Sequence, residues 1–185
     1  MQSTLRFDGG REHDIAQTAV TATIGQARPS RLSLRAAIGA VLDGSLEGEG
    51  RTYDIGPGFI VSASVAKQWV SGYWFLTGSF SVSASRTTTT ENLPGAARQS
   101  LVAIDLARAG LTAGRTFGPV SPYVVARAFG GPVLWEIDAM DVVGTDVHHF
   151  QLGAGVSVTT GSLSVLVDVA ALGEQAASLG VALRL

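Results

Sequence analysis

The side chains best suited to acid–base chemistry lie between residues 136 and 149. Asp146 and His148 are one residue apart, and His149 follows them directly. A carboxylate that orients an imidazole is the arrangement that makes histidine an effective general base. Three further carboxylates precede this pair, at Glu136, Asp138 and Asp141. Their spacing matches no specific metal-ligand pattern, and loop carboxylates are usually solvated, so we expect no metal site and no cofactor.

A second set of charges is spread along the predicted strands, on faces that otherwise carry small residues. It contains both signs: Arg35, Asp105, Arg108, Arg127, Asp168 and Arg184. A charge inside a closed structure needs an oppositely charged partner or water. We therefore predict Arg–Asp pairs that cross the interior, fill it and make it rigid.

The elements that must position these charges are β-strands, because apolar and small or polar residues alternate with a period of two. Between residues 31 and 43, Leu32, Leu34 and Ile38 share one face, whereas Arg35 and Gly39 lie on the other. The same contrast recurs over 54–69, 74–85, 150–159 and 178–185. Each of these segments therefore predicts a strand with two chemically different sides.

Composition indicates what the two faces meet. The 185 residues are 46% hydrophobic and only 15% charged, against about 25% charged in a typical soluble domain. A soluble sheet shows water a face rich in Lys and Glu, whereas the polar faces here are mainly Ser, Gly, Thr and Ala. Large outward and small inward side chains fit a membrane barrel, which must close because unpaired edges are costly in lipid. We predict an all-β fold, a closed antiparallel up-and-down transmembrane β-barrel that forms one domain over residues 1–185.

Other classes of protein are excluded by simple counts. The formal charge of −2 provides no basic surface for nucleic acid, and zero Cys excludes disulfides and thiolate chemistry. No run approaches the roughly 18 apolar residues that a spanning helix needs. Residues 1–7 lack the apolar run of a secretory signal, so we expect an exported protein to be the processed form.

Ten strands are predicted, and eight is the alternative, because the first strand is short and the last two merge if 173–175 is not a turn. The ten are expected at 2–7, 14–26, 31–43, 52–69, 73–86, 100–115, 121–131, 147–159, 163–172 and 176–185. Tight turns alternate with longer connections at 44–51, 87–99 and 132–146, which is typical of outer-membrane barrels. The apolar register also shifts near residues 107–110, which indicates a β-bulge.

The alternating strands, the loop rhythm and the terminal strand resemble small outer-membrane β-barrel proteins of Gram-negative bacteria over essentially the whole chain. The resemblance implies a monomer in the bacterial outer membrane, with the lipid bilayer as partner. It is architectural, and the chain ends in Leu185 where that family usually has an aromatic residue. The Asp146-x-His148 tripeptide also resembles the Asp–His half of the omptin proteases, but their second acidic pair has no Asp-x-Asp counterpart here.

Aromatic residues stand at the ends of predicted strands, at Trp69, Tyr73, Trp74, Phe117 and Tyr123. Amphipathic rings at such positions are expected to form a belt at the level of the lipid headgroups. The alternative is that Trp69 and Trp74 pack across a hairpin in a soluble core.

We expect a barrel with a polar lumen filled by side chains, which is not an enzyme and acts as a structural, anchoring or interaction protein through its outer loops. Ten strands enclose too little space for a wide channel, since porin-like lumens have about 16 to 18. The alternatives are a narrow channel for small solutes, an omptin-like hydrolase at the rim, and a soluble lipocalin-type barrel.

Overall fold

The structure is a computed structural model that describes residues 1–70, 72–137 and 140–183. Within these ranges the fold is one antiparallel sheet, and the single helical element is a short turn, η1 (Asp8–Gly10). The thirteen strands are β1 (Gln2–Phe7), β2 (Glu12–Ala27), β3 (Leu32–Gly48), β4 (Arg51–Ile55), β5 (Gly58–Val70), β6 (Trp74–Glu91), β7 (Arg98–Arg115), β8 (Val120–Gly130), β9 (Pro132–Ile137), β10 (Met140–Asp146), β11 (Phe150–Thr160), β12 (Leu163–Gly173) and β13 (Ala176–Leu183). The prediction of an all-β, antiparallel fold is confirmed.

The strand count differs from the expected ten, and from eight, for two reasons. The segment 52–69 is divided into β4 and β5, because Pro57 has no N–H for a ladder and the N–H of Gly56 bonds to the carbonyl of Thr88 instead, at 2.7 Å. The segment 132–146 was expected to be a loop, but it contains β9 and β10.

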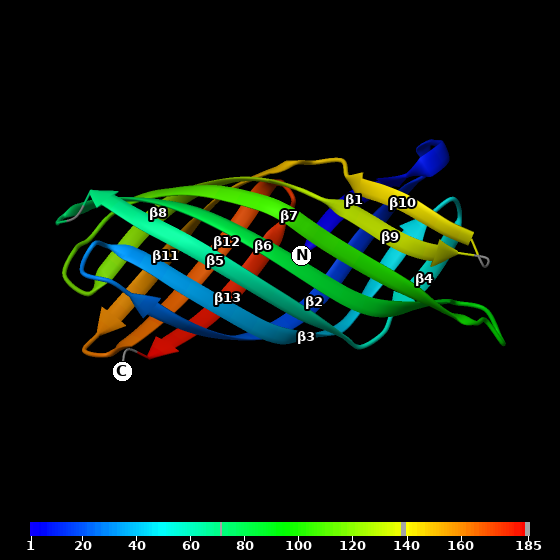
Figure 1. Ribbon diagram of the computed structural model, residues 1–185, viewed down its shortest axis with the longest axis horizontal. Helices are drawn as coiled ribbons and strands as arrows, with labels where there is room; N and C mark the ends of the chain where they lie inside the picture. Colours follow the sequence, from blue (N-terminus) through cyan, green and yellow to red (C-terminus); the bar gives the residue numbers. More distant parts are fainter. Residues whose placement is uncertain (71, 138–139, 184–185) are drawn as a thin grey trace.

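Eight strands form a ring, in which β7 pairs with β9, β10 pairs with β1, and β2, β3, β5 and β6 lead back to β7. The strands β8, β11, β12 and β13 follow β7 on its other side. We call the end of the molecule with β1, β4, β9 and β10 the closed end, and the end with β5, β8, β11, β12 and β13 the open end (Figure 1). At the open end the sheet runs from β2 round to β13 without a pairing between these two strands.

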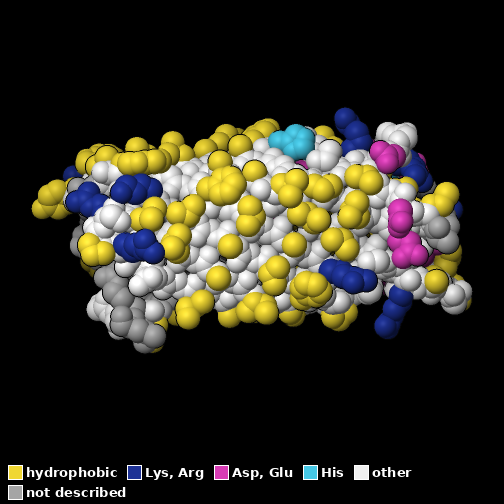
Figure 2. Space-filling model, in the orientation of Figure 1, with side chains coloured by type: hydrophobic (Ala, Val, Ile, Leu, Met, Phe, Trp, Pro, Cys, Tyr) yellow, Lys and Arg dark blue, Asp and Glu magenta, His cyan; other side chains and the backbone are white. Residues whose placement is uncertain are grey.

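The outer surface of the open end is apolar. Among the described residues, 35 large hydrophobic side chains are exposed and 15 hydrophobic residues are buried, the reverse of a water-soluble domain. Figure 2 shows apolar side chains over the body of the molecule, while the acidic side chains visible on this face lie at the closed end. Among the most exposed are Val20, Ile24, Ile38, Val124, Leu179, Val181 and Leu183, at 60–80% of their full accessibility.

The closed end has the opposite organisation, with apolar residues inside and charged residues outside. Its buried cluster comprises Leu5, Phe7, Ile15, Val41, Leu46, Tyr53, Ile55, Leu101, Val133, Trp135, Ile137 and Val142. Charged side chains alternate with these on the outer face, such as Glu12, Asp14, Glu47, Asp54 and Glu136. The sequence analysis expected small or polar residues throughout the interior and did not anticipate this cluster.

The change of face occurs between β4 and β5, within the segment that was expected to be one strand. Ile55 in β4 is 3% exposed, whereas Phe59 in β5 is 51% exposed, although the two are an even number of residues apart. In an unbroken strand they would share one face, so the break at Gly56 and Pro57 exchanges the faces. The apolar pattern therefore points inward at the closed end and outward at the open end.

Trp135 is the centre of the apolar cluster. Its ring packs edge-on against Tyr53, with centroids 4.9 Å apart, and against His13 at 5.2 Å. Its indole N–H donates to the hydroxyl of Thr89, at 2.9 Å, so the buried donor is satisfied.

Among the described residues, no helix is both long and apolar enough to cross a membrane.

Candidate functional site

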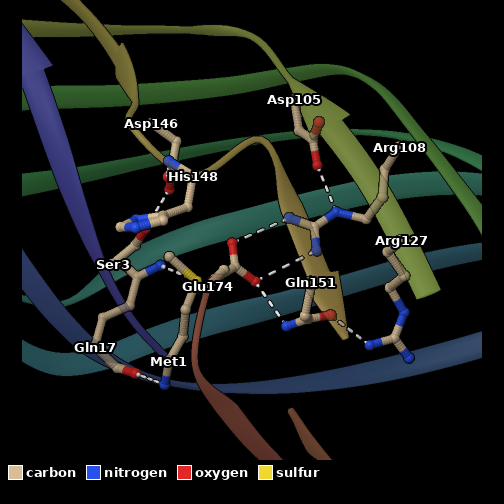
Figure 3. Close-up of polar contacts among 10 residues, drawn as sticks. All are labelled: Met1, Ser3, Gln17, Asp105, Arg108, Arg127, Asp146, His148, Gln151 and Glu174. Carbon is tan, nitrogen blue, oxygen red and sulfur yellow. Dashed lines mark hydrogen bonds and ion pairs between the residues drawn. The ribbon is translucent and has the colours of Figure 1, made fainter. Parts of the chain in front are cut away.

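Polar and charged side chains meet inside the sheet where the two ends join, and we call this group the central network. Figure 3 shows Asp105, Arg108, Arg127, Gln151 and Glu174 of this group. It is built from β7, β8, β11, β12 and the turn between β12 and β13. Its members are Asp105, Arg108, Tyr123, Arg127, Gln151, Asp168 and Glu174. Four of these seven are among the charges that the sequence predicted for the interior.

A bulge in β7 makes the first half of the network possible. The pairing of β6 with β7 steps from Ser81 opposite Arg108 to Ser83 opposite Asp105, so β7 contains one extra residue there. Two residues three apart normally point to opposite faces of a strand, but the extra residue turns both side chains inward. The guanidinium Nε of Arg108 then donates to Asp105 Oδ2, at 2.7 Å.

Arg108 also binds a second carboxylate, that of Glu174. Its two terminal nitrogens lie 3.4 and 3.3 Å from Glu174 Oε1 and Oε2, the two-pronged geometry of an arginine–carboxylate pair. The guanidinium carbon stands 4.2 Å from the ring centre of Phe129. Arg108 is therefore held by two carboxylates and one aromatic face.

The second half of the network is centred on Arg127. Its guanidinium donates to Asp168 Oδ2, at 3.3 Å, and to the side-chain oxygen of Gln151. Tyr123 donates its hydroxyl to the same Asp168 oxygen, at 3.2 Å. Gln151 is 2% exposed and donates its amide to Glu174, at 3.1 Å, so it joins the two halves.

Glu174 and Gln151 belong to the network although the sequence analysis did not select them. Glu174 was expected in a turn between strands, yet it is 4% exposed. Gly173 directs it inward: its φ is +76°, and a Cβ at this position would collide with the backbone oxygen of Phe150. The placement of Gln151 on the polar face of its strand was the available signal for its inward direction, whereas no local pattern identified Glu174.

Two of the predicted lumen charges are not in the network. Arg35 lies opposite Ser64 in the sheet and is exposed, and it makes no ion pair among residues 1–70, 72–137 and 140–183. A partner was expected because the interior was expected to be enclosed, but at Arg35 the sheet is open and water can reach the guanidinium. Arg184 lies outside the described residues.

The structure also separates the five residues of the predicted aromatic belt, because four are exposed near turns and Tyr123 is not. Trp69, Tyr73, Trp74 and Phe117 are 55–78% exposed near the turns of the open end. Arg115 lies between two of these rings, 5.2 Å from the centre of Trp74 and 4.8 Å from that of Phe117.

Tyr123 differs from the other four, because its hydroxyl points inward to Asp168. Its neighbours in β8 explain the difference: Val124 is 62% exposed and Val125 only 5%, so odd-numbered residues of this strand face the interior. Tyr123 therefore belongs to the central network and not to the exposed rim.

The Asp146 and His148 pair does not have the geometry of an oriented base. Asp146 Oδ1 accepts the backbone N–H of His148, at 2.7 Å, and its other oxygen accepts the hydroxyl of Ser3. The imidazole Nδ1 of His148 is buried and has no hydrogen-bond partner in the described part of the chain. The carboxylate therefore fixes a turn of the backbone, since it holds the peptide and not the ring.

A concavity of about 360 Å³ adjoins this pair, lined in part by Gln2, Asp14, His148 and Gln175. It lies where β1 begins. No three His, Asp or Glu side chains among the described residues are grouped closely enough to hold a metal ion. Comparison with known protein families, with curated proteins and with solved structures finds no match for this chain.

Proposed function

We propose that this protein is an integral β-barrel of a bacterial outer membrane, with a structural, anchoring or interaction role and a lumen blocked by its own side chains. The observation that supports this best is the apolar outer surface of the open end. Monomeric soluble proteins rarely expose a contiguous apolar patch of more than a few hundred Å². Here large aliphatic side chains cover the outside of successive strands, and acyl chains are the environment that suits them.

The dimensions of the open end agree with a bilayer. The strands β8, β11 and β12 each have 11 residues, and transmembrane strands have about 9–11. At about 3.4 Å per residue such a strand is about 34 Å long, and a tilt of about 40° gives a height of about 26 Å. An outer-membrane barrel has an apolar band about 25 Å tall.

The rim of the open end supports the same assignment. The exposed rings of Trp69, Trp74 and Phe117 border the apolar surface, and Arg115 lies against two of them. Aromatic rings and snorkelling cations are favoured at the level of the headgroups. The charged outer face of the closed end then lies beyond the bilayer, where it is available to a partner.

The contents of the interior favour a blocked lumen over a channel. An ion that enters from the open end meets the central network, and the apolar cluster around Trp135 lies behind it. Passage would require several buried contacts to break, which we regard as incompatible with steady conduction. A separate observation opposes a rim hydrolase: the Asp146 carboxylate accepts the backbone N–H of His148 and does not orient an imidazole.

The test is refolding of the chain into detergent and phosphatidylcholine vesicles, followed by gel electrophoresis with and without boiling. We expect the unboiled chain to migrate differently and to stay with the vesicles after washing at high pH. A chain that stays monomeric in plain buffer contradicts the membrane assignment. Recordings in planar bilayers separate the two membrane functions, because a blocked barrel gives no steady conductance and a small-solute channel does.

A further inference from the structure

Two strand edges at the open end have no partner among the described residues. β1 covers β2 only from Glu12 to Gln17, and β13 pairs only with β12. In the described part of the chain, the outer edges of residues 18–27 and of β13 therefore carry unpaired peptide groups. Unpaired edges can pair with other chains in water, so soluble proteins protect them, and they are especially unfavourable in a membrane.

The two edges diverge from a single residue. Gln2 lies opposite Ala16 of β2 on one side, and on its other side it exchanges both backbone hydrogen bonds with Gln175, at 2.7 and 2.9 Å. Ala16 and Gln175 are thus separated by the width of one strand. Beyond this point β2 and β13 continue toward the open rim, and none of the thirteen described strands lies between them.

The direction of the strands shows what fits there. From β2 the sheet passes through β3, β5, β6, β7, β8, β11 and β12 to β13, and every step is antiparallel. These eight steps give β2 and β13 the same direction. One strand placed between them would be antiparallel to both, and β1 already runs in that direction.

We propose that one further strand pairs with both edges, continues β1 on the amino-terminal side of Met1 and completes the sheet at the open end. The hydrogen bonds between β1 and β2 already extend to Met1. The amino group of Met1 donates to the carbonyl of Gln17, at 3.0 Å, and the N–H of Gln17 donates to the carbonyl of Met1, at 3.0 Å. A segment joined to Met1 in extended form would next meet Thr18 on one side and Ala177 on the other.

The side chains of β2 and β13 that flank the proposed strand indicate which residues it should contain. On the outer side the flanking residues are Val20, Ile24, Leu179 and Val181, each at least 60% exposed. On the inner side they are small or hydroxylated: Ala19, Thr21, Thr23, Ser178, Gly180 and Ala182. The occupant therefore alternates apolar residues outward with Ser, Thr, Gly or Ala inward, and the residue next to Met1 points outward.

This inference goes beyond the proposed function, and it rests on the two edges and not on the membrane assignment. A second occupant would be another copy of the chain, and a third possibility is direct closure of β2 on β13. Direct closure would make the single parallel pairing in an otherwise antiparallel sheet. Continuity with β1 favours the strand in line with Met1, because neither alternative uses the hydrogen-bond ladder at Gln17.

The first experiment adds a strand and changes only its phase. Ser-Val repeats matching the eight residues of β13 are fused ahead of Met1, so that each Val is outward and each Ser inward. The control has Val-Ser repeats of the same length and composition, which exchange the two faces. Both chains are refolded in detergent beside the unextended chain, and amide hydrogen exchange is followed by mass spectrometry.

We expect the Ser-Val chain to slow exchange in residues 18–27 and 176–183 by roughly tenfold or more. The Val-Ser chain should leave these segments as fast as in the unextended protein. Equal protection from both phases, or none from Ser-Val when the rest of the sheet is protected, would overturn the proposal. So would an unextended chain that is dimeric by light scattering and already protected along these two edges.

A cross-link tests the separation of the two edges without any added segment. Ala19 and Ser178 would flank the same residue of the missing strand, so their Cα atoms are expected about 10 Å apart, beyond the reach of a disulfide. In a chain with no native Cys, the Ala19→Cys/Ser178→Cys variant should stay reduced under mild oxidation. The control is Ser164→Cys/Ala182→Cys, whose positions are paired in adjacent strands, and which should cross-link. Efficient bridging of positions 19 and 178 would indicate direct closure and refute the inference.

Discussion

Replacement of Glu174 by Gln tests whether the central network holds the β12–β13 hairpin in place. The carboxylate is 5% exposed, and it accepts two N–H groups from Arg108 and one from Gln151. The Glu174→Gln amide retains one oxygen for Gln151 but turns an NH₂ group toward the guanidinium, donor against donor. Arg108 would keep Asp105 as its counter-ion, at 2.7 Å.

The size of the effect follows from these contacts. Breaking a fully buried ion pair is destabilising by about 3–5 kcal/mol, and a hydrogen bond to a charged group contributes about 1.5–3 kcal/mol. Because Arg108 is 28% exposed and retains one carboxylate, we expect a loss no larger than the lower limit for a fully buried pair and within the range for a charged hydrogen bond. The free energy of unfolding should fall by about 2–3 kcal/mol.

The assay is guanidinium unfolding in detergent micelles, followed by tryptophan fluorescence. The matched control is Glu12→Gln, which removes an ion pair with Arg6 whose side chains are 56% and 49% exposed. That exposed pair should contribute at most about 1 kcal/mol. If Glu174→Gln lowers the unfolding free energy no more than Glu12→Gln does, the network does not stabilise the hairpin and our reasoning is wrong.

Three further predictions concern the closed end and the turn before Glu174. Burial lowers the pKa of His13 in the folded chain, so the unfolded chain binds the proton more readily and stability should decline as the pH falls below about 6.5. In denaturant titrations between about pH 7 and 5, His13→Gln should remove this dependence of stability on pH. An unchanged dependence would exclude His13 as its source. Trp135→Ala empties the centre of the apolar cluster and leaves the Thr89 hydroxyl without its donor, so the free energy of unfolding should fall by about 3–5 kcal/mol. A loss below about 1 kcal/mol would mean that the cluster is not packed as described. Gly173→Ala places a side chain on a left-handed backbone and against the backbone oxygen of Phe150. It should lower the free energy of unfolding by more than about 1 kcal/mol, which thermal unfolding can measure. A neutral result would show that the turn adopts another conformation.

The strands could be predicted wherever one apolar face continues without interruption. Alternation over 31–43 and 150–159 identified β3 and β11 because every second residue meets the same surroundings. The prediction of a loop at 132–146 was wrong, because Val133, Trp135 and Ile137 point inward there while Glu136 points outward, as in a soluble sheet. An exchange of the inward and outward faces leaves the period of two unchanged, so alternation does not show which face of a strand points inward.

The central network could be predicted in part for a similar reason. Arg108 and Asp105 stand on either side of a shift in apolar register, and that shift was the signal for a bulge. The second carboxylate bound by Arg108, Glu174, is sixty-six residues away in the sequence. It lies in a turn whose inward direction depends on the left-handed Gly173. A long-range contact that depends on one backbone angle has no counterpart in local sequence pattern.

The most direct test of the membrane assignment is the environment of Ile38, which is 65% exposed on the outer face of β3. The chain has no native Cys, so a fluorophore can be attached to the Ile38→Cys variant alone and compared with the Glu136→Cys variant at the closed end. In phosphatidylcholine vesicles, brominated acyl chains should quench the label at position 38 and leave the label at position 136 unchanged, while aqueous iodide should do the reverse. Quenching of position 38 by iodide, with no effect of brominated lipid, would contradict the account.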